Sequence, residues 1–196
     1  MLNLRSCLAL AAIWLVSCST TEPLGSTGYP AENWTVVNRD TGEPIPDAWI
    51  SIRYFRTYPG LGDSQTVCIR AESFKADGNS HFKLPPEIRD TVMSKTAAKL
   101  GYTMPIGRIN DPTKREVYLV PFTGTQDEVF YNALRESQPS QCHSDDDKVR
   151  ELPKRKYFLE QAAKLVDLGN AGQMSSLNEY KKDIKEFERR VGGAKQ

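Results

Sequence analysis

The feature of this sequence that most limits its fold is a change of hydrophobic period part-way along the chain. Between residues 34 and 122, short runs of β-branched and aromatic residues are separated by turns that contain Gly, Asp and Pro, which is typical of strands. After Phe122, apolar residues recur at helical spacing. Because the strands come before the helices, we expect a mainly β fold: an antiparallel β-sandwich over residues 33–122 with a C-terminal α-helical extension over residues 123–196.

One expected strand, residues 48–58, carries large side chains on both faces. The alternation places Ala48, Ile50, Ile52 and Tyr54 on one face and Trp49, Ser51, Arg53 and Phe55 on the other, outer face. An outer face with large apolar groups needs a cover, and we expect the helical extension to supply it. The alternative is a binding surface for a sugar or a peptide, formed by Trp49, Arg53, Phe55 and Tyr58.

Apolar residues at helical spacing occur in several segments. Residues 127–136 and, after Pro153, residues 154–168 are predicted to be helices, and a capping box of Ser176 and Glu179 predicts the start of another. Residues 87–100 also show helical spacing and are predicted to form a helical insert. The polar residues 137–147 are predicted to form a loop.

The N-terminus has the layout of a secretory signal. A single charge at Arg5 precedes an apolar run that ends at Val16; this run is shorter than the roughly 20 residues that cross a bilayer. The run leads into Leu15-Val16-Ser17-Cys18, which resembles the lipobox of bacterial lipoproteins. The resemblance implies removal of residues 1–17 and attachment of lipid to Cys18. Residues 18–32, which are rich in Gly, Pro, Ser and Thr, then form a flexible tether. The alternative is an ordinary signal peptide with a chance cysteine.

The lipobox resemblance also implies a location. Lipoproteins of this type carry a diacylglyceryl thioether and usually an N-acyl chain, and two or more acyl chains hold a protein durably on a membrane. The residue after Cys18 is Ser19 rather than Asp, which in enteric-type bacteria favours the inner leaflet of the outer membrane. We therefore expect a lipid-anchored protein of the cell envelope that faces the periplasm.

The expected processing leaves two cysteines that carry no lipid. Of the 4 cysteines, Cys7 leaves with the signal and Cys18 takes lipid, so Cys68 and Cys142 remain. In an oxidising compartment a disulfide between them is the natural pairing. It closes a loop of about 75 residues, for which chain-entropy arguments give roughly 4 kcal/mol of stabilisation. The alternative is two separately buried thiols.

Charge and motif content argue against several classes of function. Lys and Arg number 26 against 25 Asp and Glu, so no basic field exists to attract nucleic acid. The only histidines, His81 and His143, have no second ligand at metal spacing. Residues 144–147 lack the alternation and the Gly of a calcium loop and fit a solvated turn or a helix N-terminus better. No Gly-x-Ser-x-Gly elbow supports a catalytic triad. We predict no catalytic residue, no metal and no cofactor.

Three stretches resemble carboxypeptidase regulatory-like domains. Residues 36–50 contain a valine-rich strand, a turn with Asp and Gly, then Pro-Ile and a small residue before an apolar strand. Residues 76–85 resemble the family's later Asp-Gly hairpin, and Gly101-Tyr102 resembles its Gly-Tyr pair. The resemblance covers about residues 34–122 and implies a transthyretin-like sandwich of about seven strands. The long spacing from Gly78 to Phe82 and the insert at 87–100 depart from the family pattern.

The resemblance implies a fold rather than a function, because such folds host many functions. Domains of this family serve as stabilising, adhesive or binding modules and share no catalytic residue. We expect a membrane-anchored, non-catalytic binding or structural module of the cell envelope, with another envelope protein or peptidoglycan as its partner. The alternative is an outer-membrane lipoprotein that belongs to a secretion or envelope assembly. An enzyme is a third possibility, without a visible nucleophile and base to support it.

Overall fold

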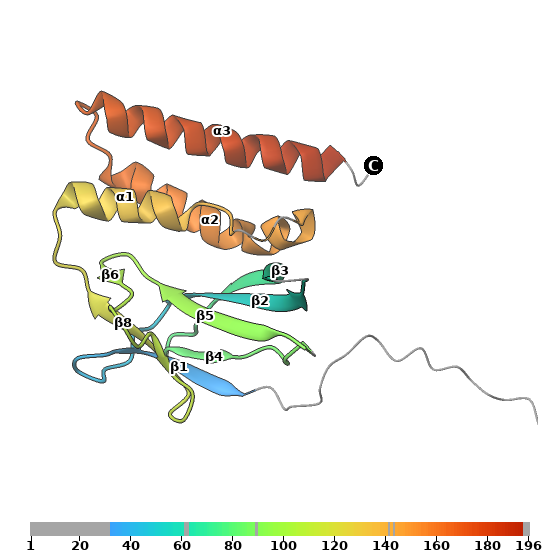
Figure 1. Cartoon of the computed structure of the whole chain (residues 1–196). Coiled ribbons are helices and arrows are strands. Elements are labelled where there is room, and N and C mark those ends of the chain that lie inside the picture. Colours follow the sequence, from blue (N-terminus) through green and yellow to red (C-terminus); the bar gives the residue numbers. More distant parts are fainter. Residues whose placement is uncertain (1–31, 61–62, 89, 141, 143, 194–196) are drawn as a thin grey trace, which may run out of the picture.

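The computed structural model describes residues 32–60, 63–88, 90–140, 142 and 144–193. The expected signal peptide, Cys18 and the tether up to residue 31 lie outside the described residues, as does His143. The described part stacks two β-sheets and places the helices on one side of the stack (Figure 1). Helices α1 and α2 lie next to the second sheet, and α3 lies on their far side. The expected β-sheets, whose pairings are mostly antiparallel, and the expected C-terminal helical extension are therefore present.

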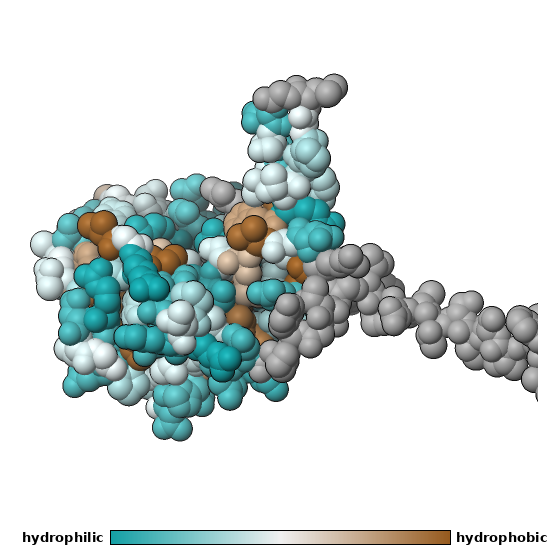
Figure 2. Space-filling model, turned by 60° about the horizontal axis from the view of Figure 1, so that its bottom comes forward, coloured by the Kyte–Doolittle hydropathy of each residue, from teal (hydrophilic) through white to brown (hydrophobic). Residues whose placement is uncertain are grey.

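The first sheet has the strand order β4-β1-β8-β6, with β7 also paired to β8. Its strands are β1 (Asn33–Asn38), β4 (His81–Lys83), β6 (Tyr102–Thr103), β7 (Asn110–Asp111) and β8 (Glu116–Pro121). The pairing of β1 with β8 is parallel, with Val36 opposite Val117, whereas the sequence predicted antiparallel strands only. Parallel neighbours need a long crossover, and the whole chain between β1 and β8 supplies it. The face of the molecule opposite the helices is mostly hydrophilic, with apolar residues scattered over it (Figure 2).

The second sheet has the order β3-β2-β5 and is antiparallel throughout. Its strands are β2 (Trp49–Pro59), β3 (Ser64–Lys75) and β5 (Val92–Ala98). The register between β2 and β3 shifts at one place: Tyr54 faces Arg70, but Phe55 faces Cys68. Ile69 is therefore the extra residue of a β-bulge. Strict alternation would turn Cys68 toward the sandwich interior, and the bulge places it on the outer face instead.

The helical insert predicted over residues 87–100 is wrong, because this segment contains β5. Met93, Lys95 and Ala97 stand opposite the inward residues of β2, and Val92, Ser94, Thr96 and Ala98 stand opposite its outward residues. The apolar spacing at 88, 92, 93, 96 and 100 therefore indicated the wrong period. Pairing with the long strand β2 decides the conformation, as tertiary context often does for short β-compatible segments.

Two hydrophobic cores hold the layers together. The first lies between the sheets and includes Val36, Ile50, Ile52, Phe82 and Leu119. The second lies between the outer face of the second sheet and the helices, where Trp49 and Ala98 meet Phe130, Phe158, Leu159, Ala162, Leu177 and Ile184. The helices therefore cover the outer face of β2, as its large side chains led us to expect.

The helices are α1 (Gln126–Glu136), α2 (Asp145–Leu165) and α3 (Ala171–Gly193). Thr125 and Glu128 form a capping box at the start of α1. Helix α2 begins nine residues before the predicted start at residue 154, with Ser144 as its N-cap and Pro153 inside it. Helix α3 begins before the predicted capping box, because the Asn170 side chain accepts the backbone N–H groups of Gly172 and Gln173. Within the described ranges no helix has the length and apolarity needed to span a bilayer.

Candidate functional site

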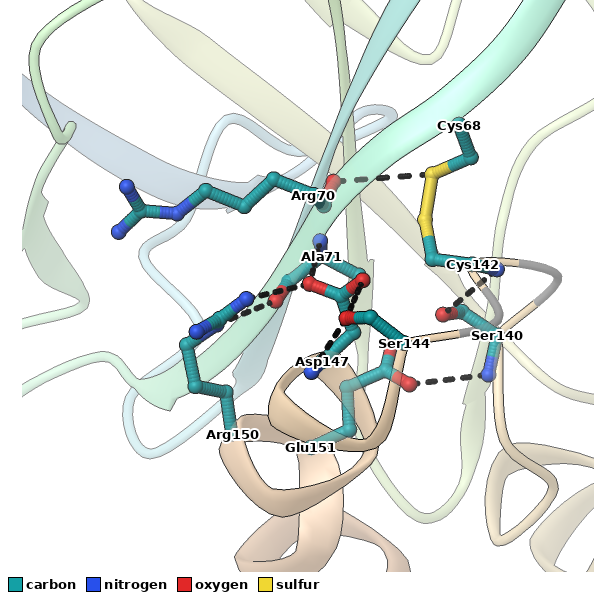
Figure 3. The surroundings of a disulfide bond; sticks show 9 residues. All are labelled: Cys68, Arg70, Ala71, Ser140, Cys142, Ser144, Asp147, Arg150 and Glu151. Carbon is teal, nitrogen blue, oxygen red and sulfur yellow. Dashed lines mark hydrogen bonds and ion pairs between the residues drawn. A yellow bond between two sulfur atoms is a disulfide. The ribbon is translucent and has the colours of Figure 1, made fainter. Parts of the chain in front are cut away.

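A disulfide bond fastens the helical layer to the edge of the second sheet (Figure 3). Cys68 lies in β3 and Cys142 lies between α1 and α2, with their Cα atoms 5.1 Å apart. The bulge at Ile69 makes this possible, since it places Cys68 on the face toward the helices. The expected pairing of the two cysteines is confirmed, and the alternative of two separate thiols is not found.

Two side chains of α2 bind the backbone of β3 beside the disulfide. The backbone N–H of Ala71 donates to the Asp147 carboxylate at 2.8 Å, and Arg150 donates from Nε to the Ala71 carbonyl at 3.0 Å. β3 is an edge strand, and the outward backbone groups of an edge strand lack a partner strand. Asp147 and Arg150 therefore occupy, at Ala71, the positions that the backbone of a further strand would use.

Asp147 is held as a buried carboxylate. Its residue is 1 % exposed, and the Ser144 hydroxyl and the Arg150 guanidinium donate to it in addition to Ala71. Burial raises the pKa of the Asp147 carboxyl, but the hydrogen bonds from Ser144, Ala71 and Arg150 outweigh that effect and hold the pKa below its ordinary value of 3.8. The carboxylate is thus charged at neutral pH and fixes three groups around the start of α2.

The segment that carries Cys142 is itself fixed by polar contacts. The backbone N–H of Ser140 donates to Glu151 of α2 at 2.9 Å, and the N–H of Cys142 donates to the Ser140 hydroxyl at 3.4 Å. These contacts fix the position of the segment that leads from α1 to Cys142. The disulfide, the contacts at Ala71 and the fixed segment together form one joint between the layers, which we call the β3 joint (Cys68, Ala71, Cys142, Asp147 and Arg150).

Two cations of α2, one partly and one fully buried, extend the polar contacts across the helical layer. Lys154 donates to the Ser51 hydroxyl of β2 at 3.0 Å and to Glu136 of α1 at 2.7 Å. The next residue, Arg155, is 2 % exposed; it donates to the Ser137 carbonyl at 2.9 Å and to Asp183 of α3 at 2.6 Å. Helix α2 is thereby bonded to the sheet and to both other helices.

A groove of about 600 Å³ lies along α2 and the C-terminal half of α3. Four of the residues that line it are cationic and two are anionic; the lining consists of Pro139, Lys148, Arg155, Asp183, Glu186, Phe187, Arg189, Arg190 and Gly193. Asp183, Glu186, Phe187 and Arg190 share one face of α3, because they are spaced by three and four residues. We call this the α2–α3 groove. Its volume is in the range of small-ligand and peptide sites.

The four residues predicted as a possible binding surface are not brought together as one open surface. Trp49 is 9 % exposed and packs against Tyr157 of α2, with ring centroids 5.9 Å apart. Arg53 and Phe55 are partly buried farther along β2, and Tyr58, 46 % exposed, lies where β2 and β3 extend past β5. For Trp49 the structure therefore agrees with the expected packing under the helical extension and not with the alternative, an open binding surface.

The other residues weighed for chemistry have structural roles where they are described. The His81 ring lies 3.2 Å from the Thr35 hydroxyl on the first sheet. Residues 144–147, the weak calcium candidate, form the N-cap and first turn of α2. Across the described residues, no three or more His, Cys, Asp and Glu side chains are grouped to hold a metal ion.

Sequence reasoning missed the most elaborate part of the site, the contacts at Ala71. The signal was present, because Ser144 followed by three Asp residues is a strong N-cap and first turn. Pro153 conceals this signal, because Pro is typical of the first turn of a helix, yet here it lies inside α2, where a helix tolerates it at a cost. The α2–α3 groove had no signal of its own in the sequence beyond the adjacent Arg189 and Arg190.

Comparison with known proteins gives no relative. A scan of family models finds none that matches the chain, and searches of curated proteins and of solved structures also find no match.

Proposed function

We propose that this protein is a membrane-anchored lipoprotein that acts as a non-catalytic binding or structural module in the cell envelope. The observation that carries the proposal is the sequence Leu15-Val16-Ser17-Cys18 behind a short apolar run. Lipid on Cys18 holds the protein on the inner leaflet of the outer membrane, and residues 18–32 let the folded part move beside it. No catalytic role is assigned to any residue.

The β3 joint supports this proposal. Disulfides persist in oxidising compartments such as the periplasm and are rare where thiols are kept reduced. Cys68 and Cys142 form such a bond, and Asp147 and Arg150 reinforce the same joint. A platform stiffened in this way suits a module that presents a surface to a partner rather than one that opens and closes.

The sandwich belongs, in this proposal, to the transthyretin-like class. The stretches that resemble carboxypeptidase regulatory-like domains fall on β1 and the start of β2, on the turn into β4, and on the start of β6. All three therefore lie in the β-sandwich, where the resemblance requires them. The agreement of order and position supports the class, which in turn favours a binding or structural role.

Two cysteine substitutions test the anchor. Cells that produce the wild type, Cys18→Ser or the matched control Cys7→Ser are fed radioactive palmitate and then fractionated. We expect label and membrane association for the wild type and for Cys7→Ser, and neither for Cys18→Ser. Equal labelling of all three, or a mature N-terminus other than an acylated Cys18 by mass spectrometry, would overturn the proposal.

A second candidate is an outer-membrane lipoprotein that belongs to a secretion or envelope assembly. The α2–α3 groove favours it, because an open, charged groove in the helical layer offers a place for another chain. Mild cross-linking of intact membranes followed by purification of this protein tests it. A partner recovered in fixed proportion supports the assembly, and recovery of the protein alone argues against it.

A further inference from the structure

We infer that the α2–α3 groove is a binding site for an acidic peptide segment of a partner protein. This inference deepens the proposed binding role and rests on it, although the groove itself is described independently of the membrane anchor.

The cations of the groove are incompletely neutralised. Arg155 has a close ion pair with Asp183 at 2.6 Å. Lys148 and Arg190 share a single anion, Asp145, at 3.7 and 3.6 Å, both beyond hydrogen-bond distance. Arg189 has no ion pair or hydrogen bond with any residue that the structure describes. An arriving carboxylate therefore finds guanidinium groups with free donors, which bind carboxylates in paired, charge-assisted hydrogen bonds.

Apolar side chains also line part of the groove. Phe187 is 4 % exposed and lines the groove together with Pro139. The Arg190 guanidinium lies over the Phe187 ring at 5.4 Å from its centroid, so this exposed cation lies beside the apolar side chain of the groove. A recessed aromatic ring with cations beside it fits a peptide that carries carboxylates on either side of an apolar side chain.

The same shape argues against a membrane surface as the occupant. A flat layer of anionic headgroups would meet cations on a protruding face, whereas Phe187 is recessed and Arg155 is 2 % exposed. The exposed lysines on the rest of α3, such as Lys181 and Lys185, do not line the groove. These two lysines therefore provide a test that separates a peptide in the groove from non-specific attraction to the helix.

The experiment measures fluorescence anisotropy with the full protein purified from its producing cells in non-ionic detergent. The probe is a fluorescein-labelled peptide in which glutamates flank one leucine, and the same peptide with lysines in place of glutamates is the control. We expect binding of the acidic probe only, weakened as salt is added because the attraction is screened.

Charge variants locate the binding. Arg189→Glu with Arg190→Glu should weaken the acidic probe about tenfold or more, since two charge-assisted pairs become repulsions. The matched control, Lys181→Glu with Lys185→Glu, removes and adds the same charges on the same helix and should change the affinity less than about twofold. Arg189→Gln removes a cation without any described partner, so it keeps the fold intact and should still weaken binding measurably.

Several outcomes would overturn the inference: no binding at low salt, equal losses in the two double variants, or an unchanged affinity of Arg189→Gln. Preferential binding to vesicles of anionic lipid, lost equally in both double variants, would assign the charges to a membrane instead. Cys18→Ser separates the two proposals. Probe binding by a Cys18→Ser protein that still associates with membranes would overturn the anchor alone. The absence of probe binding by a wild type that loses its membrane association in Cys18→Ser would overturn the groove alone.

Discussion

The carboxylate of Asp147 accepts a hydrogen bond from the backbone N–H of Ala71 at 2.8 Å, 76 residues away in sequence. The contact joins the first turn of a helix to the outward side of an edge strand, and Arg150 completes it from the same helix. Both backbone groups of Ala71 are thereby satisfied by side chains.

The first prediction concerns the carboxylate itself. Asp147→Asn keeps the shape but removes the charge that Arg150, Ser144 and Ala71 share. We expect the free energy of unfolding to fall by about 1–3 kcal/mol, because a buried hydrogen-bonded charge is replaced by a poorer acceptor. Asp146→Asn, an exposed neighbour in the same turn, is the control and should change stability by less than about 0.5 kcal/mol. Urea denaturation measures both, and equal effects would contradict the role given to Asp147.

The second prediction concerns pH. Because the folded-state pKa of Asp147 lies below its ordinary value of 3.8, its stabilisation is complete well above that value and is lost as the pH falls through the folded-state pKa. Below about pH 4 the wild type should therefore lose stability more steeply than Asp147→Asn. The pKa values of Asp47 and Asp111 are also lowered, but they act equally in both proteins. Parallel acid-unfolding curves for the two proteins would refute the prediction.

The third prediction concerns the disulfide. Cys68→Ala and Cys142→Ala should each lower the free energy of unfolding by about 2–4 kcal/mol, since either change frees the long loop that the bond closes. The double variant should cost about the same as one single variant, because all three lose the same bond. Denaturation under non-reducing conditions measures this, with a thiol titration of the unfolded wild type as a control. Two reactive thiols in that titration would show that the bond is absent.

The fourth prediction concerns the cover over β2. Phe158 lies in the core that joins the helices to Trp49. Phe158→Ala should therefore cost about 3–5 kcal/mol and shift the Trp emission to longer wavelength as Trp49 meets water. Leu168→Ala, at a residue 80 % exposed, should leave both stability and emission unchanged. An unchanged emission in Phe158→Ala would mean that the helices do not shield Trp49.

The sequence predicted the sheet and helix layers better than the contacts that join distant segments of the chain. Large apolar side chains alternate along β2, with Ile50 and Ile52 on one face and Trp49 and Phe55 on the other. This alternation predicts that both faces are buried, and therefore that the helices cover the outer face. The conformation of residues 92–98 did not follow, since their pairing with β2 depends on a strand that is distant in sequence. The role of Asp147 did not follow either, because an acidic first turn looks the same whether it meets solvent or the edge of a sheet.

The outer strands of the second sheet are protected in two ways. On β3, Asp147 and Arg150 occupy the backbone groups of Ala71. On β5, Lys95 stands opposite the inward-facing Ile52, with its ammonium 4.7 Å from the centroid of the Trp34 ring. An inward-pointing charge on an edge strand discourages pairing with another chain. These contacts disfavour the pairing of a partner strand with either edge of the second sheet.

The parallel pairing of β1 with β8 also sets the order in which the protein can fold. β2 and β3 pair through a local hairpin and need no later part of the chain. The first sheet, in contrast, cannot close until residues 116–121 have left the ribosome, and contacts of such long sequence separation form slowly. Helix α2 is synthesised after β8, so the outward backbone groups of Ala71 in β3 lack their partners until α2 has formed. A nascent chain of this kind depends on protection from aggregation during synthesis more than its finished fold suggests.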